Sequence, residues 1–62
     1  MLGKKIRETR KSKKLTLKDL SDATGLTSSY ISQVEREIVD PSISSLRKIS
    51  AALQVPMFTL LD

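Results

Sequence analysis

Short hydrogen-bonding side chains recur at helical spacing between residues 28 and 33 of this 62-residue chain. Each is small or flexible enough to approach the edge of a base, and a glutamine amide matches the donor and the acceptor that adenine presents in the major groove. Ile31 and Val34 point to the opposite side of the expected helix. This pattern suits direct readout of duplex DNA by four side chains, Ser28, Ser29, Ser32 and Gln33.

Positive charge is concentrated at the start of the chain. Residues 1–14 contain seven lysines and arginines and one acid, a net charge of +6, whereas residues 15–62 contain four bases and six acids, a net charge of −2. Such a surface attracts phosphate-rich partners, although a solvated helix face accounts for the same charges equally well. A membrane-surface helix is disfavoured because Leu2 and Ile6 are too few apolar anchors.

The composition argues against an enzyme and against any metal or cofactor. The chain has no cysteine and no histidine, which removes thiolates, the commonest metal ligand and the commonest catalytic base. Two glycines are too few for a glycine-rich phosphate loop. The longest apolar run, Ala51-Ala52-Leu53, is too short for a membrane span or a secretory signal. We therefore expect a cytoplasmic protein.

A single all-α domain is expected over residues 1–62. Apolar residues recur every three or four positions, and no alternating strand pattern is present. Thr16, Thr27 and Ser42 are suited to cap helices, and Gly25 is suited to end one. Five helices are expected, at about 2–13, 17–24, 28–36, 43–53 and 56–61.

The turn between the second and third expected helices is the most informative local feature. It contains only residues 25–27, which makes the helices cross steeply, at roughly 90–120°. Ser21 is small enough to lie at the crossing, and four residues at suitable offsets fill the junction. This is the pattern of a helix-turn-helix, whose second helix enters the major groove. The junction residues are Leu20, Leu26, Ile31 and Val34.

The stretches Leu15–Ser21 and Gly25–Arg36 resemble the phage repressor/Cro type of helix-turn-helix domain, which is widespread among bacterial regulators of the xenobiotic-response class. Asp40-Pro41-Ser42, and Val55-Pro56 followed by Leu60-Leu61, match the rest of that pattern. The resemblance covers essentially the whole chain. It implies a compact five-helix, lambda-repressor-like domain that binds double-stranded operator DNA as a homodimer.

The resemblance also implies a role for individual residues. The third helix, at 28–36, would read bases through the four polar side chains named above. Arg10 of the first helix would form a structural ion pair with Glu35, and so would not contact DNA. Arg36 is either a phosphate contact or a favourable charge at a helix C-terminus. The phosphate contacts implied by the resemblance are Thr16, Leu17, Lys18, Thr27, Arg36, Ser42, Ile43 and Ser44.

Three departures from the family pattern change these expectations. Leu17 stands where many members carry a glutamine that reaches DNA, so we expect it to cover the helix junction or touch sugars and thymine methyls. Glu37 stands where members often have glycine, and must adopt whatever turn is required there. Ile38, Val39 and Asp40 replace the basic residues of the following loop, so backbone amides must do more of the phosphate binding.

A contact between two copies is the second candidate site, and it consists of Ile38, Val39, Met57 and Phe58. Ordinary packing against the first and fourth helices is the alternative for these residues. A protein-interaction module of the same fold, such as an antitoxin or assembly domain, is the main alternative function. RNA binding is weaker because Tyr30 and Phe58 are the only aromatic residues. Whether the chain is a complete regulator or the DNA-binding part of a longer one is left open.

Overall fold

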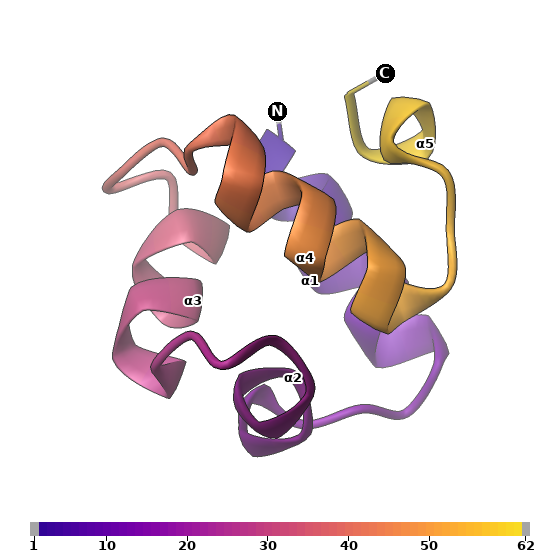
Figure 1. The fold of residues 1–62 in the computed structure, drawn as a ribbon, viewed down its shortest axis with the longest axis horizontal. Coiled ribbons are helices and arrows are strands. Elements are labelled where there is room, and N and C mark those ends of the chain that lie inside the picture. The colour runs from indigo at the N-terminus through magenta and orange to yellow at the C-terminus, as the bar shows by residue number, and fades with distance from the viewer. Residues whose placement is uncertain (1, 62) are drawn as a thin grey trace.

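The computed structural model describes residues 2–61, and within this range it consists of helices without any strand. As predicted, the fold is all-α with five helices. α4 crosses in front of α1, α3 lies to the left, α2 lies below and α5 lies at the upper right (Figure 1). The bounds are α1 Leu2–Ser12, α2 Leu17–Thr24, α3 Ser28–Glu35, α4 Ile43–Leu53 and α5 Met57–Leu61.

Local capping signals explain where α2 begins and ends. The Thr16 hydroxyl accepts a hydrogen bond from the Asp19 amide at 3.0 Å, and the Asp19 carboxylate accepts one from the Thr16 amide at 2.8 Å. This reciprocal pair is a capping box. Its two hydrogen bonds lower the pKa of Asp19 below the ordinary value of 3.8. At the other end Gly25 has φ +78°, the left-handed conformation that glycine adopts without strain.

The core takes apolar side chains from all five helices. Each of these side chains has 2% or less of its surface exposed. Helical spacing alone predicts Ala23 on the same side of α2 as Leu20 and Thr24, but Ala23 is exposed and only the other two are buried. The core residues are Ile6, Leu20, Ile31, Val34, Leu46, Ile49, Leu53 and Leu60.

The N-terminus of α1 packs closely against the C-terminus of α3. A Cβ atom on Gly3 would overlap the carbonyl oxygen of Val34 and would lie 2.8 Å from that of Glu35. Just beyond α3, Glu37 adopts φ +65°, and its carboxylate accepts a hydrogen bond from the Lys4 amide at 3.2 Å. Glu37 therefore ends one helix with its backbone and satisfies a free amide of another with its side chain.

Candidate nucleic-acid interface

The turn between α2 and α3 is braced by side chains of α2. The Ser21 hydroxyl donates to the Leu26 carbonyl at 2.6 Å. The Thr24 hydroxyl donates to the Leu20 carbonyl at 2.6 Å and accepts from the Leu26 amide at 3.1 Å. With Gly25 left-handed, these bonds define the path of the three-residue turn. Ser21, the small residue expected at this junction, thus bonds the turn through its hydroxyl.

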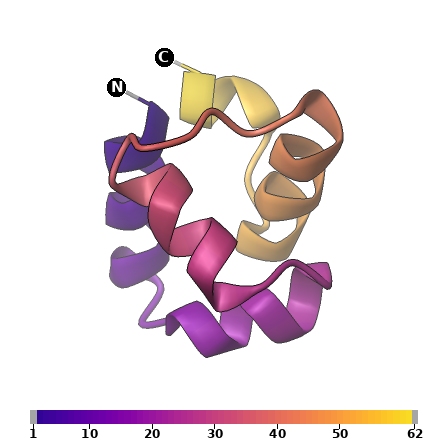
Figure 2. The ribbon, with the colours of Figure 1, turned by 90° about the vertical axis from the view of Figure 1, so that its left-hand side faces the viewer.

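The outward side of α3 presents the four side chains expected to read bases. Figure 2 shows α3 crossing the face of the molecule, with the start of α2 to its lower left and the start of α4 to its upper right. Ser29 is exposed, and Ser28, Ser32 and Gln33 are half-buried. Within residues 2–61 none of these four side chains takes part in a hydrogen bond. Their donors and acceptors are therefore available to an external partner.

The starts of α3 and α4 are each capped by a hydroxyl, as is that of α2, but without the reciprocal carboxylate bond. The Thr27 hydroxyl accepts from the Tyr30 amide and the Ser42 hydroxyl accepts from the Ser45 amide, each at 3.0 Å. Because these hydroxyls are engaged, the groups left for a phosphate are the unbonded amides of each first turn. Among the residues expected to bind phosphate, only Leu17 is half-buried; the exposed ones are Thr16, Lys18, Thr27, Arg36, Ser42, Ile43 and Ser44.

Lys18 differs from the other candidate phosphate contacts because it already has a partner. Its ammonium group lies 3.0 Å from the carboxylate of Asp22, one turn further along α2. Both side chains are mostly exposed, so this pair is worth well under about 1 kcal/mol. A phosphate can displace Asp22 at little cost, and the pair leaves Lys18 able to bind DNA.

Arg10 and Glu35 form a buried pair behind α3. The Arg10 guanidinium donates from Nε and Nη2 to the two oxygens of Glu35, at 2.8 and 3.0 Å, and from Nη1 to the Leu15 carbonyl at 2.9 Å. The residues are only 8% and 7% exposed. The hydrogen bond to Glu35 is the main cause that raises the pKa of Arg10 above its ordinary value. The pair joins α1, the α1–α2 link and α3, so it sets the position of α3.

The structure adds a residue that the sequence interpretation did not single out. Arg7 lines a pocket of about 160 Å³ where α1, the start of α2 and α3 meet. A usable signal existed, because Arg7 precedes Arg10 by three positions and so shares its side of α1. The pocket is lined by Arg7, Arg10, Leu17, Ser32, Glu35 and Arg36.

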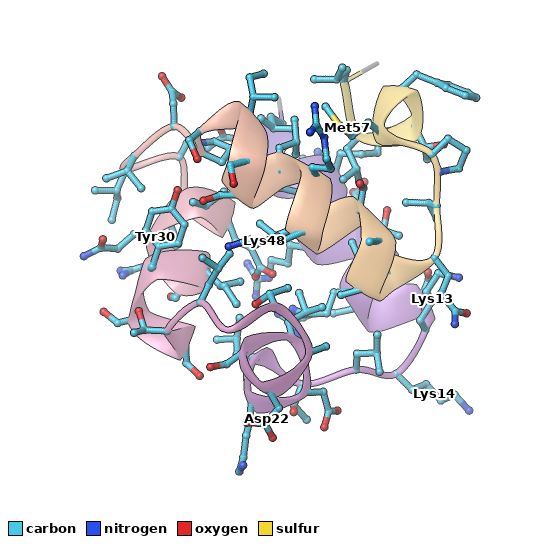
Figure 3. The ribbon with its side chains drawn as sticks, in the orientation of Figure 1. Lys13, Lys14, Asp22, Tyr30, Lys48 and Met57 are labelled. Atoms are coloured by element: carbon cyan, nitrogen blue, oxygen red, sulfur yellow. The ribbon has the colours of Figure 1, made fainter. Side chains whose placement is uncertain are left out.

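The residues expected at a contact between copies fall into two groups. Ile38 and Phe58 are 59% and 74% exposed, whereas Val39 and Met57 are half-buried and pack against the core. Met57 lies where α5 meets α4 (Figure 3). The structure thus leaves Ile38 and Phe58 as surface apolar groups and gives Val39 and Met57 a packing role.

Two other basic residues lie away from α3. Lys13 and Lys14 are at the corner after α1, on the opposite side of the molecule from α3 (Figure 3). Tyr30, by contrast, is half-buried on α3 and packs against the core.

Within residues 2–61 no cluster of three carboxylate or other metal-ligating side chains is present. No helix in that range is long and apolar enough to cross a membrane.

The fold and this surface define a helix-turn-helix protein. The family model described as "Helix-turn-helix" matches residues 6–60, and the chain belongs to this family. The chain is 43% identical over its whole length to the HTH-type transcriptional regulator SinR of Bacillus subtilis, of which it spans 57%. It is 35% identical, over 87% of its length, to the immunity repressor of Bacillus phage phi105, of which it spans 38%.

Solved structures agree with this assignment. A crystal structure of SinR in complex with DNA superposes with a TM-score of 0.93, at 43% identity and with both chains fully covered. The restriction-modification controller protein C.AhdI of Aeromonas hydrophila superposes with a TM-score of 0.92, at 32% identity, covering 95% of this chain and 89% of that one. These relatives are regulators rather than enzymes.

Proposed function

We propose that this chain binds an operator in double-stranded DNA sequence-specifically and acts as the DNA-binding part of a cytoplasmic transcriptional regulator. The observation that carries the proposal is the outward side of α3. Its polar side chains have no internal hydrogen bond in the part of the chain that the structure describes, and capped starts of α2 and α4 flank it. The similarity to a SinR domain solved with DNA supports the same function.

Gln33 is the proposed principal reader, because its amide can bond two atoms of one adenine. Ser28, Ser29 and Ser32 add single hydrogen bonds to neighbouring base edges or to the backbone. The first-turn amides of α2, α3 and α4, together with Lys18 and Arg36, bind phosphates on either side of the groove. These contacts fix the register in which the bases are read.

A homodimer is the proposed binding unit. Ile38 and Phe58 are large apolar side chains left on the surface, and a second copy of this chain would cover them. Two joined copies would address half-sites about one helical turn apart, roughly 34–36 Å. The operator would then be an inverted repeat.

Base and phosphate contacts are separated by a pair of substitutions. Gln33→Ala is expected to cost about 1–3 kcal/mol of binding free energy on the operator and to relax one base position. Lys18→Ala is expected to weaken binding to operator and random duplexes by the same factor, and to lower the salt dependence. Fluorescence anisotropy on both duplexes measures this. An equal loss for Gln33→Ala on random DNA would show that Gln33 reads no base.

A further inference from the structure

The pocket between α1, α2 and α3 is lined by more positive charges than the structure pairs with carboxylates. Three arginines, Arg7, Arg10 and Arg36, and one carboxylate, Glu35, line it. Glu35 is already bound by Arg10, with an Nε to Oε2 distance of 2.8 Å. Within residues 2–61 the exposed guanidiniums of Arg7 and Arg36 have neither an ion-pair nor a side-chain hydrogen-bond partner. Two charges therefore face the pocket uncompensated.

We propose that this pocket binds one phosphodiester group of the operator backbone, with Arg7 of α1 and Arg36 at the end of α3 as its two charged ligands. This inference rests on the proposed function. A guanidinium presents a planar pair of donors that matches phosphate oxygens. The pocket volume of about 160 Å³ is well above the roughly 10–15 Å³ that one water molecule requires on the same measure, so the pocket has room for a group larger than water.

The other lining residues suit the same ligand. Ser32 contributes a hydroxyl without an internal partner, and Leu17 offers an apolar surface to the neighbouring sugar. The capping box uses the amides of Thr16 and Asp19, which leaves those of Leu17 and Lys18 at the positive end of the α2 dipole. In this arrangement Ser32 contacts the phosphate, and the side chains of α3 left to contact bases are Ser28, Ser29 and Gln33.

The position of the pocket explains how a single bound phosphate can align α3 with the DNA. It takes residues from α1 and from both helices of the helix-turn-helix. Arg10 lies at its inner side, held by Glu35 and by the Leu15 carbonyl, and so contributes charge without being free to move. A phosphate bound here would fix the distance from the DNA backbone to α3.

Arg7→Ala tests the proposal, with Lys13→Ala as the matched control. Both substitutions remove one positive charge, but Lys13 lies on the opposite side from α3 (Figure 3). Lys14 is unsuitable because its φ of +60° would strain an alanine. Affinity for operator and random duplexes is measured by anisotropy between 50 and 200 mM salt. One phosphate contact contributes about 0.9 to the log–log salt slope, so the fourfold rise in salt should weaken Arg7→Ala about 3.5-fold less than the parent.

The expected pattern has three further parts. Arg7→Ala weakens binding to the operator and the random duplex by the same factor. Arg7→Lys keeps most of the salt slope because lysine keeps the positive charge. In the Arg36→Ala background, Arg7→Ala has a smaller effect than in the parent, because the two arginines share one ligand. Lys13→Ala leaves the affinity and the slope close to those of the parent.

Other results would overturn the proposal in distinguishable ways. If the parent binds operator DNA and Arg7→Ala behaves like Lys13→Ala, the pocket holds no phosphate and the proposed function stands. If the parent binds no duplex at all, both fail together. Pyrophosphate is the probe for a free anion: saturable binding that shifts the NMR signals of the Arg7 and Arg36 side chains, without competing with DNA, would assign the pocket to a small anionic ligand instead.

Discussion

Glu35→Ala is expected to remove most of the stability of this domain. The substitution leaves the Arg10 guanidinium buried beneath α3 without its carboxylate. Breaking a buried pair by deleting one partner costs about 3–5 kcal/mol. Domains have roughly 0.05–0.15 kcal/mol of stability per residue, so a chain of 62 residues has only about 3–9 kcal/mol in total. Urea denaturation followed by circular dichroism measures the change in the free energy of unfolding.

Two comparisons make this expectation specific to the pair. Glu8→Ala removes an exposed glutamate from α1 and is expected to change stability by less than about 0.5 kcal/mol. Replacing both partners, as in Arg10→Met with Glu35→Leu, is expected to recover much of the loss, because no buried charge is left unpaired. Equal stabilities for Glu35→Ala and Glu8→Ala would show that the pair does not hold α3 in place.

Gly3→Ala is expected to destabilise the domain although alanine favours helices. The added methyl would collide with the backbone carbonyls of Val34 and Glu35, neither of which can rotate away as a flexible side chain could. Overpacking of this kind costs typically about 1–3 kcal/mol, against about 1 kcal/mol gained from helix propensity. The separation of α1 from α3 would also strain the hydrogen bond from the Lys4 amide to Glu37.

Gly25→Ala is the informative comparison for Gly3→Ala, because each glycine is needed for a different reason. Nothing lies within 4 Å of a Cβ atom at Gly25, so its replacement is opposed only by φ +78°. That strain costs about 1–2 kcal/mol without any collision. Gly3→Ser should therefore be worse than Gly3→Ala, whereas Gly25→Asn should be tolerated better than Gly25→Ala. A Gly3→Ala protein as stable as the parent would contradict the close approach of α1 to α3.

Local signals made much of the fold predictable from the sequence. Thr16, Thr27 and Ser42 each cap the helix that they were expected to cap, and Gly25 ends α2 in the left-handed conformation. Such signals act within four residues of the chain, so they are visible without knowing the tertiary structure. The boundaries of α2 match for this reason, and those of the other helices agree to within about one residue.

Contacts between distant residues were less predictable. The hydrogen bond between the Glu37 carboxylate and the Lys4 amide joins residues 33 positions apart, and the local sequence around either residue does not predict it. The need for glycine at position 3 also depends on where α3 ends. Spacing also does not show that Ala23 is exposed while Leu20 and Thr24 are buried, because at 100° per residue the three lie within about 100° of one another around α2.

The candidate site shows the same division. The polar side of α3 follows from helical spacing alone, and the structure leaves those side chains without internal partners. The pocket lined by Arg7 and Arg36 depends on the angle between α1 and α3, which spacing does not determine. Met57 and Phe58 are adjacent and similarly apolar, and only the position of α5 decides that one packs inward and the other faces solvent.

Selection from random duplex DNA, followed by titration of the selected duplex against salt, tests whether this domain binds an operator sequence-specifically. We expect an enriched inverted repeat with half-sites about one helical turn apart, and a log–log salt slope equal to several neutralised phosphates. Enrichment of no sequence, with weak binding that disappears at physiological salt, would contradict it. The polar side of α3 would then face a protein partner rather than an operator.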